Sequence, residues 1–123
     1  DYSKFTHINY GFTDIGYEST SDPYNFFLRA FEWNDVMEWT IGQDWTEPQG
    51  NMLDVINNAH AAGVKALICV GGWNFNDPAS ATYVAHDNHQ TAWIFTTMIS
   101  QKEYRDQFIR SVIEYCQTYG FDG

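Results

Sequence analysis

The fold of this chain is decided by one short stretch, Lys65-Ala66-Leu67-Ile68-Cys69-Val70-Gly71-Gly72. Its apolar run is unbroken, and such runs are typical of strands that are covered on both faces, as in parallel sheets. Residues 51–62 precede it with apolar side chains at helical spacing, and Gly63 then supplies a left-handed helix end. The pattern predicts a helix, a very short turn and a buried strand.

The segments on either side repeat this order. The β-rich run at residues 5–12 predicts an earlier buried strand, closed by a turn at residues 13–16. A capping box at residues 100–103 predicts the start of a second helix that ends at Gly120, and Phe121 then begins another strand. Strands that alternate with helices predict an α/β fold with a parallel sheet and right-handed crossovers. The apolar side of the second helix is expected to comprise Tyr104, Phe108, Ile109, Val112, Ile113 and Cys116.

Composition excludes several classes of protein. The 123 residues are 44% hydrophobic and 18% aromatic, which excludes intrinsic disorder. Six Lys and Arg against sixteen Asp and Glu give a net charge of −10, which argues against nucleic-acid binding. No apolar run approaches the roughly 18–20 residues that cross a bilayer. Two cysteines, Cys69 and Cys116, are too few for a disulfide framework and are expected to be buried free thiols, although a disulfide is left open.

The two long connections both follow a predicted strand and precede a predicted helix. They cover residues 17–49 and 73–97, whereas the opposite connections are very short. In a (β/α)₈ barrel, the strand-to-helix loops build the active-site face. Aromatic side chains in the first connection either pack it into a satellite core or line a sugar-binding groove, and they are Tyr24, Phe26, Phe27, Phe31, Trp33, Trp39 and Trp45.

Three segments together resemble the family-18 glycoside hydrolases, the chitinases and their relatives. Residues 6–12 are similar to that family's second barrel strand, and Cys69-Val70-Gly71-Gly72-Trp73-Asn74-Phe75 to its Ser-x-Gly-Gly-Trp signature. Residues 95–123 resemble the helix that leads into the fourth strand. The resemblance implies a partial TIM (β/α)₈ barrel with strands two and three, their helices and the start of strand four. Because a complete barrel takes about 250 residues, residues 1–123 are expected to be an incomplete catalytic domain.

The resemblance also implies an activity. Family-18 chitinases hydrolyse β-1,4 links between N-acetylglucosamine units with retention, by the substrate-assisted exception to the two-carboxylate scheme. The substrate's acetamido oxygen attacks the anomeric carbon, and the glutamate of an Asp-x-x-Asp-x-Asp-x-Glu motif is the general acid. Asp122 matches the first aspartate of that motif, with a supporting catalytic role. The alternative is an ordinary carboxylate at a strand start. We expect the chain to end before the inner aspartates and the glutamate.

Four residues match the family's substrate-binding positions. Phe12 would help to form the floor of the sugar pocket, with core packing as the alternative. Gly72 would let the backbone pass close to the sugar, Trp73 would stack on it, and Asn74 would hydrogen-bond it. A phosphate-binding turn is the other interpretation of the glycine pair, but it requires an immediate helix and further glycines, which residues 73–78 lack.

The expected partner is chitin or a chito-oligosaccharide, outside the cell, with no cofactor and no metal. His86 and His89 lie in a polar stretch and are interpreted as solvated, because the sequence places no third ligand near them. One position departs from the family: Cys69 stands where a serine is usual, and a thiol is a weaker donor than a hydroxyl.

Three functions therefore stay open. A chitinase ranks first, a chitin-binding lectin with the same barrel but without the glutamate second, and an unrelated (β/α) protein third. The first two share every feature of residues 1–123, so these residues do not separate them.

We expect residues 1–123 alone not to hydrolyse a chromogenic chitobioside, because the general acid is missing from them. The measurement is release of the chromophore by the purified chain. Turnover above that of a buffer blank would contradict this expectation.

Overall fold

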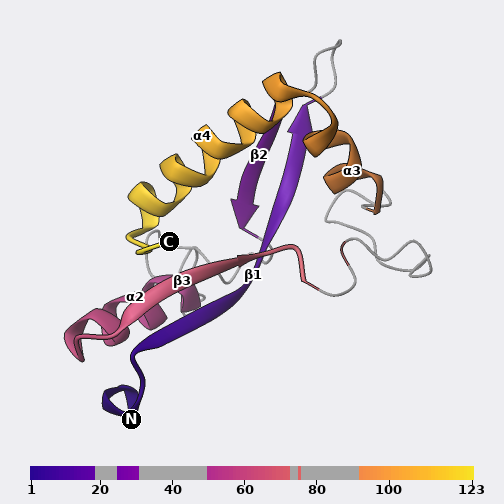
Figure 1. Ribbon diagram of the computed structural model, residues 1–123. Coiled ribbons are helices and arrows are strands. Elements are labelled where there is room, and N and C mark those ends of the chain that lie inside the picture. The colour runs from indigo at the N-terminus through magenta and orange to yellow at the C-terminus, as the bar shows by residue number, and fades with distance from the viewer. Residues whose placement is uncertain (19–24, 31–49, 73–74, 76–91) are drawn as a thin grey trace, which may run out of the picture.

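A computed structural model of the chain describes residues 1–18, 25–30, 50–72, 75 and 92–123. It is a mixed α/β structure with a three-stranded sheet in the order β2-β1-β3 (Figure 1). The elements in chain order are η1 (Tyr2–Lys4), β1 (His7–Glu18), β2 (Asn25–Ala30), α2 (Asn51–Ala61), β3 (Lys65–Val70), α3 (Ala92–Ser100) and α4 (Lys102–Tyr119).

Strand β1 is the long central strand, and its two halves have different partners. From His7 to Thr13 it pairs in parallel with β3, whereas from Thr13 to Glu18 it pairs antiparallel with β2. Helix α2 lies between the two parallel strands in sequence and packs against both of them, while α4 lies along β2 (Figure 1). The predicted strand, helix and parallel strand are thus confirmed.

Helix α2 ends as its sequence predicts. Gly63 is left-handed, with φ of 71°. The Val64 N–H donates to the Ala59 carbonyl and the Gly63 N–H to the His60 carbonyl, each at 2.9 Å, which is the Schellman pattern. This end lets β3 begin at Lys65 with no further loop. The helix buries Met52, Ile56 and Ala59.

The turn expected at residues 13–16 is wrong, because β1 continues through it. Asp14 is fully buried, and its Oδ2 accepts hydrogen bonds from Arg29 Nη2 at 2.8 Å and Nε at 3.1 Å. Asp14 Oδ1 accepts the Ile15 N–H at 2.8 Å. Arg29 belongs to β2, which lies within the connection expected at residues 17–49. Pairing with β2 therefore overrides the local turn propensity of this segment.

The capping box at residues 100–103 is also wrong. Ser100 is the last residue of α3, a helix that begins at Ala92, within the connection expected at residues 73–97. Its Oγ donates to the Thr97 carbonyl at 2.7 Å, as serine does inside a helix, and is therefore not the cap of α4. The N-cap of α4 is Gln101, with no side-chain cap hydrogen bond.

The buried side of α4 differs in part from the expectation. Tyr104 and Tyr115, three turns apart, are buried, whereas Ile109 and Ile113 are 54% and 52% exposed. The tyrosines face the sheet, and the isoleucines are rotated away from it around the helix. Both cysteines are free, as predicted, but half-buried rather than buried.

Two of the aromatic residues in the first connection, Phe26 and Phe27, belong to the described residues, and Phe26 shows whether its ring packs in a core or lines a groove. Its ring is fully buried and packs edge-on against Tyr104 at 5.5 Å and Trp93 at 6.5 Å between centroids. Core packing is therefore confirmed for this ring, but in the same hydrophobic cluster as Met52 and Ala66 rather than in a satellite core. Phe27 of the same strand is half-buried. The other aromatic residues of that set, Tyr24, Phe31, Trp33, Trp39 and Trp45, lie outside the described residues.

Replacing Arg29 with alanine is expected to lower the free energy of unfolding by about 2–3 kcal/mol, because it leaves the Asp14 carboxylate buried without its cation. Urea denaturation measures the change. Arg110→Ala, which removes an exposed arginine of α4, is the matched control and should change stability by less than about 0.5 kcal/mol. Equal effects of the two substitutions would show that the buried pair does not stabilise β1 and β2.

Candidate functional site

The carboxyl end of β3 turns sharply through two glycines. Gly71 and Gly72 have φ of 82° and 85°, a left-handed backbone that favours glycine. The Gly71 N–H donates to the Thr13 carbonyl at 2.8 Å, which fixes this turn against β1. A β-carbon at Gly71 would lie 3.0 Å from the Phe95 ring and 3.3 Å from Phe75. The turn is therefore too crowded for a side chain at this position.

Phe12 lies beside this turn because of a β-bulge in β1. Gly11 pairs with Cys69 and Thr13 with Val70, so Phe12 is the extra residue between them. The Gly11–Phe12 peptide bond is cis, and the Phe12 residue is 47% exposed. A β-carbon at Gly72 would lie 3.1 Å from the Phe12 ring. The structure thus brings together two of the predicted site residues, Phe12 and Gly72, and leaves the ring accessible.

The next two predicted site residues, Trp73 and Asn74, lie outside the described residues. Phe75 is described and fully buried, with its ring edge-on to Phe95 at 5.5 Å between centroids. Its N–H donates to the Gly72 carbonyl at 3.3 Å. The positions on both sides of residues 73–74 are therefore held in place, one beside Phe12 and one in the core.

Asp122 lies at the opposite end of β3. Its Oδ2 accepts hydrogen bonds from the Ala66 N–H and from His60 Nε2, both at 2.9 Å. The hydrogen bond from His60, followed by that from the Ala66 N–H, holds the pKa of Asp122 below its ordinary value. Ala66 precedes Val70, the last residue of β3, by four residues, which is about 13 Å along the strand, and the glycine turn lies beyond it. The structure therefore does not bring Asp122 together with Phe12 and Gly72, and its supporting role stays a prediction.

His60 is a residue that sequence reasoning missed. It lies in the last turn of α2, and 62 residues separate it from Asp122. The helix that precedes a parallel strand ends beside the start of that strand, and a neighbouring parallel strand starts at the same edge. A histidine at this helix end was therefore the available signal, but only together with the expected strand start at Phe121; the structure assigns no strand to residues 121–123, although two backbone hydrogen bonds join them to β3.

Cys69 lies on the face of the sheet away from α2. Side chains alternate between faces along a strand, and Ala66, the second residue of β3, is buried in the core that includes α2. Leu67 and Cys69 therefore point to the other face, together with their partners Asn9 and Gly11 on β1. Cys69 is half-buried there as a free thiol.

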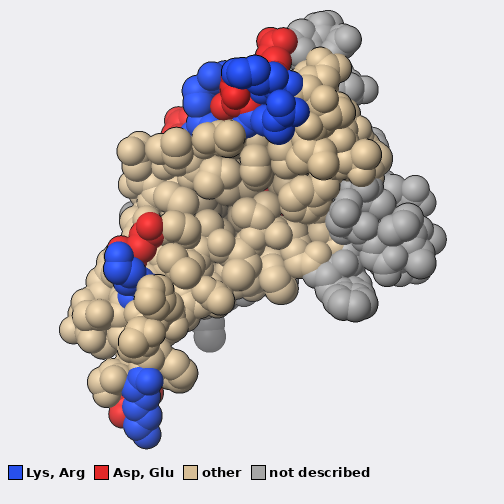
Figure 2. All heavy atoms as spheres, in the orientation of Figure 1, with Lys and Arg blue, Asp and Glu red and all other residues tan. Residues whose placement is uncertain are grey.

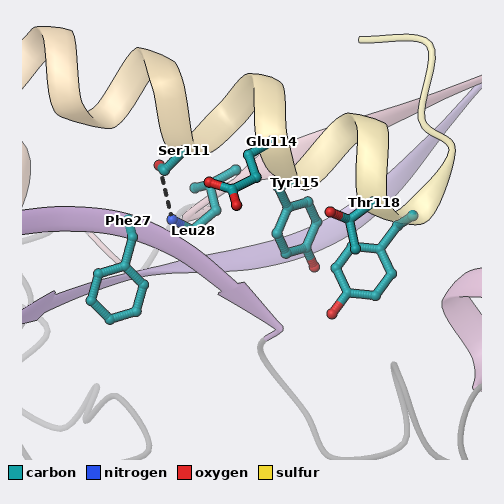
Figure 3. Close-up of a pocket in the computed structure, with 7 residues that line it drawn as sticks. Phe27, Leu28, Ser111, Glu114, Tyr115 and Thr118 are labelled. Atoms are coloured by element: carbon teal, nitrogen blue, oxygen red, sulfur yellow. Dashed lines mark hydrogen bonds between the residues drawn. The ribbon is translucent and has the colours of Figure 1, made fainter.

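A separate groove of about 300 Å³ lies between β2 and α4. Figure 3 shows Ser111, Glu114, Tyr115 and Thr118 projecting from α4. The Leu28 N–H donates to Ser111 Oγ at 3.2 Å, and this hydroxyl donates in turn to the Phe108 carbonyl at 2.8 Å. Ser111 thus satisfies an amide of the edge strand. Phe27, one of the aromatic residues considered for a sugar-binding groove, lines this groove, whereas Phe12, Gly72 and Asp122 do not.

Charged side chains on the face shown in Figure 2 gather mainly over the first half of α4. Lys102 and Asp106 form an ion pair there. The Lys102 ammonium donates a hydrogen bond to the Asp106 carboxylate, and this bond lowers the pKa of Asp106. Across the described residues, no cluster of three or more His, Cys, Asp or Glu could hold a metal ion. None of the described helices is both long and apolar enough to cross a membrane.

Comparison with known proteins gives a consistent family. The family model for glycosyl hydrolases family 18 matches residues 1–123. Over 76 residues, or 62% of the chain, the sequence is 37% identical to the oviduct-specific glycoprotein of Mesocricetus auratus and 38% identical to those of Bos taurus and Ovis aries. The matched part covers 8% of the first relative and 11% of the other two, so the chain spans about a tenth of their length.

Gly72→Ala is expected to destabilise the chain more than Gly63→Ala. Both glycines are left-handed, at an expected cost of about 1–2 kcal/mol for alanine, but Gly63 has open space around it. At Gly72 the Phe12 ring has to move as well. Urea denaturation measures the difference, and the Phe12 ring resonances should shift only in Gly72→Ala. Equal losses with unchanged Phe12 resonances would contradict the contact.

Proposed function

Because the chain belongs to glycosyl hydrolase family 18, we propose that it is part of the catalytic domain of a chitinase. The proposed architecture is a partial TIM (β/α)₈ barrel, in which β1 and β3 are strands two and three and Phe121 begins strand four. Residues 1–123 are then an incomplete domain. The parallel pairing of β1 with β3 through α2 supports this assignment.

The observation that carries the proposal is the contact between Phe12 and Gly72. Ligands of barrel enzymes bind at the carboxyl ends of the parallel strands, where both residues lie. An exposed aromatic ring next to a residue without a side chain forms a flat apolar surface that suits the face of a pyranose ring. Trp73 and Asn74, which follow directly in the sequence, are proposed to stack on and hydrogen-bond the same sugar.

The proposed chemistry is retaining hydrolysis of β-1,4 links between N-acetylglucosamine units. The acetamido oxygen of the substrate attacks its own anomeric carbon, and a glutamate seven positions after Asp122 protonates the leaving oxygen. The aspartate two residues before that glutamate orients the acetamido group and raises the glutamate's pKa by charge repulsion. Asp122 supports this machinery as its first aspartate.

A chitin-binding lectin is the second candidate, and Cys69 is the observation that favours it. The thiol lies on the sheet face away from α2, where a serine hydroxyl would support an inner aspartate. As a weaker donor, the thiol supports that carboxylate less well. Sugar binding through Phe12 and Gly72 does not depend on this position.

The proposed partner is chitin or a chito-oligosaccharide, and the proposed location is extracellular, where such polymers are found. A neutral polysaccharide suits a chain with a net charge of −10, because it sets up no charge repulsion. Neither a cofactor nor a metal is part of the proposed reaction.

The binding site is tested by NMR titration of the ¹⁵N-labelled chain with tri-N-acetylchitotriose. We expect shifts at the amides of Phe12, Gly71 and Gly72, and about tenfold weaker binding in Phe12→Ala, the loss that corresponds to about 1.4 kcal/mol. Phe5→Ala, at a 58% exposed phenylalanine outside the bulge, is the matched control and should bind normally. Equal weakening in both variants, or no shift at these amides, would overturn the site.

A longer protein that contains the seventh residue after Asp122 and the rest of the barrel distinguishes a chitinase from a lectin. A glutamate at that position together with turnover of a chromogenic chitobioside supports the chitinase. Another residue there, with binding of chito-oligosaccharide but without turnover, supports the lectin.

A further inference from the structure

The residues after α4 already pair with β3. The Asp122 N–H donates to the Ala66 carbonyl at 2.8 Å, and the Ile68 N–H donates to the Gly123 carbonyl at 2.9 Å. The Asp122 carboxylate accepts the Ala66 N–H in addition. Asp122 therefore bonds Ala66 through both its backbone and its side chain.

His60 completes this arrangement from α2. Its Nε2 donates to the same Asp122 oxygen that accepts the Ala66 N–H. The two side chains are 43% and 29% exposed, so the pair is accessible to water and weak as a source of global stability. The His60–Asp122 pair is therefore expected to act locally, on the alignment of residues 121–123 with β3.

The contacts select one register. A slip of one residue would place Phe121 or Gly123 opposite Ala66, and neither has a side chain that accepts its N–H. The slip would also move Phe121 to the other face of the sheet, because side chains alternate along a strand. In the structure this ring is buried and stacked on Tyr115 at 6.3 Å between centroids.

We propose that His60, Asp122 and the Ala66 amide form a register clamp, which aligns the segment after α4, residues 121–123, with β3. The inference rests on the proposed function, because in a chitinase the strand proposed to begin at Phe121 carries the catalytic motif. From the Asp122–Ala66 pair, β3 continues for four residues to Val70, about 13 Å along the strand, and the Gly71-Gly72 turn follows. The seventh residue after Asp122, running alongside β3, therefore lies beyond the end of β3 at which Phe12 is found. His60 and Asp122 are thus positioning residues. They lie at the start of β3, and they place the glutamate near Phe12, which lies at the other end of that strand.

The charge of Asp122 contributes to the clamp. Among the described residues, His60 from α2 and Lys65 from β3 act on its carboxylate electrostatically, and both lower its pKa. A carboxyl group whose pKa is lower in the folded state than in the unfolded state stabilises the folded state at pH values above its ordinary pKa of 3.8. This contribution is lost as the pH falls through the lowered value.

The test is amide hydrogen exchange of the full chain, measured by NMR at Ala66 and Ile68, with Ile56 of α2 as the reference for global opening. His60→Gln and Asp122→Asn are expected to accelerate exchange at Ala66 and Ile68 about two- to fivefold at pH 7 and to leave Ile56 unchanged. His7→Gln is the matched control, because His7 is exposed and its Nδ1 hydrogen-bonds the hydroxyl of the adjacent Thr6 rather than the segment after α4. It should change none of these rates.

The pH profile gives a second readout that loss of packing would not reproduce. The difference between the wild-type chain and Asp122→Asn should disappear as the pH falls through the lowered pKa of Asp122. Unchanged exchange at Ala66 and Ile68 in His60→Gln, or equal acceleration at Ile56, would overturn the clamp, and this variant decides if Asp122→Asn does not fold. Since the exchange uses no sugar, it can fail or succeed independently of the chitotriose titration.

Discussion

The backbone of β3 needs hydrogen-bond partners along both of its edges, because buried N–H and C=O groups are costly when unpaired. One edge is satisfied by β1, and residues 122–123 begin to satisfy the other. These two pairings bring together parts of the chain that are far apart in sequence. The bulge in β1 places Phe12 at Gly72, and the return of the chain after Gly120 places Asp122 at Ala66.

Much of the βαβ unit could be predicted because its signals are local. The apolar spacing of residues 51–62, the left-handed Gly63 and the unbroken run after it each reflect neighbours within a few positions. The strand through residues 13–18 could not be predicted in this way. Its buried Asp14 is stabilised by Arg29, fifteen positions away, and without that partner the same residues have the composition of a turn.

The residues of the candidate site also differ in whether local sequence signals could predict them. Phe12 and Gly72 were predicted as members of one site, and their contact follows from a strand order that the sequence pattern indicates. His60 was not predicted, because its contact with Asp122 requires the end of α2, the start of β3 and the segment after α4 to meet in space. Ser100 is the opposite case, because its local signal was misleading. The sequence around it indicates a helix cap, but in the structure Ser100 is the last residue of helix α3.

The Schellman end of α2 has a consequence for how such a chain can vary in length. Gly63 and Val64 are both hydrogen-bonded to the last turn of the helix, so the connection to β3 has no slack. An inserted residue would break these bonds and shift His60 relative to Asp122. Insertions and deletions are therefore expected to be tolerated better between the glycine turn and α3, which residues 73–91 separate in the sequence. A change of chain length there would preserve the hydrogen bonds that align residues 122–123 with β3.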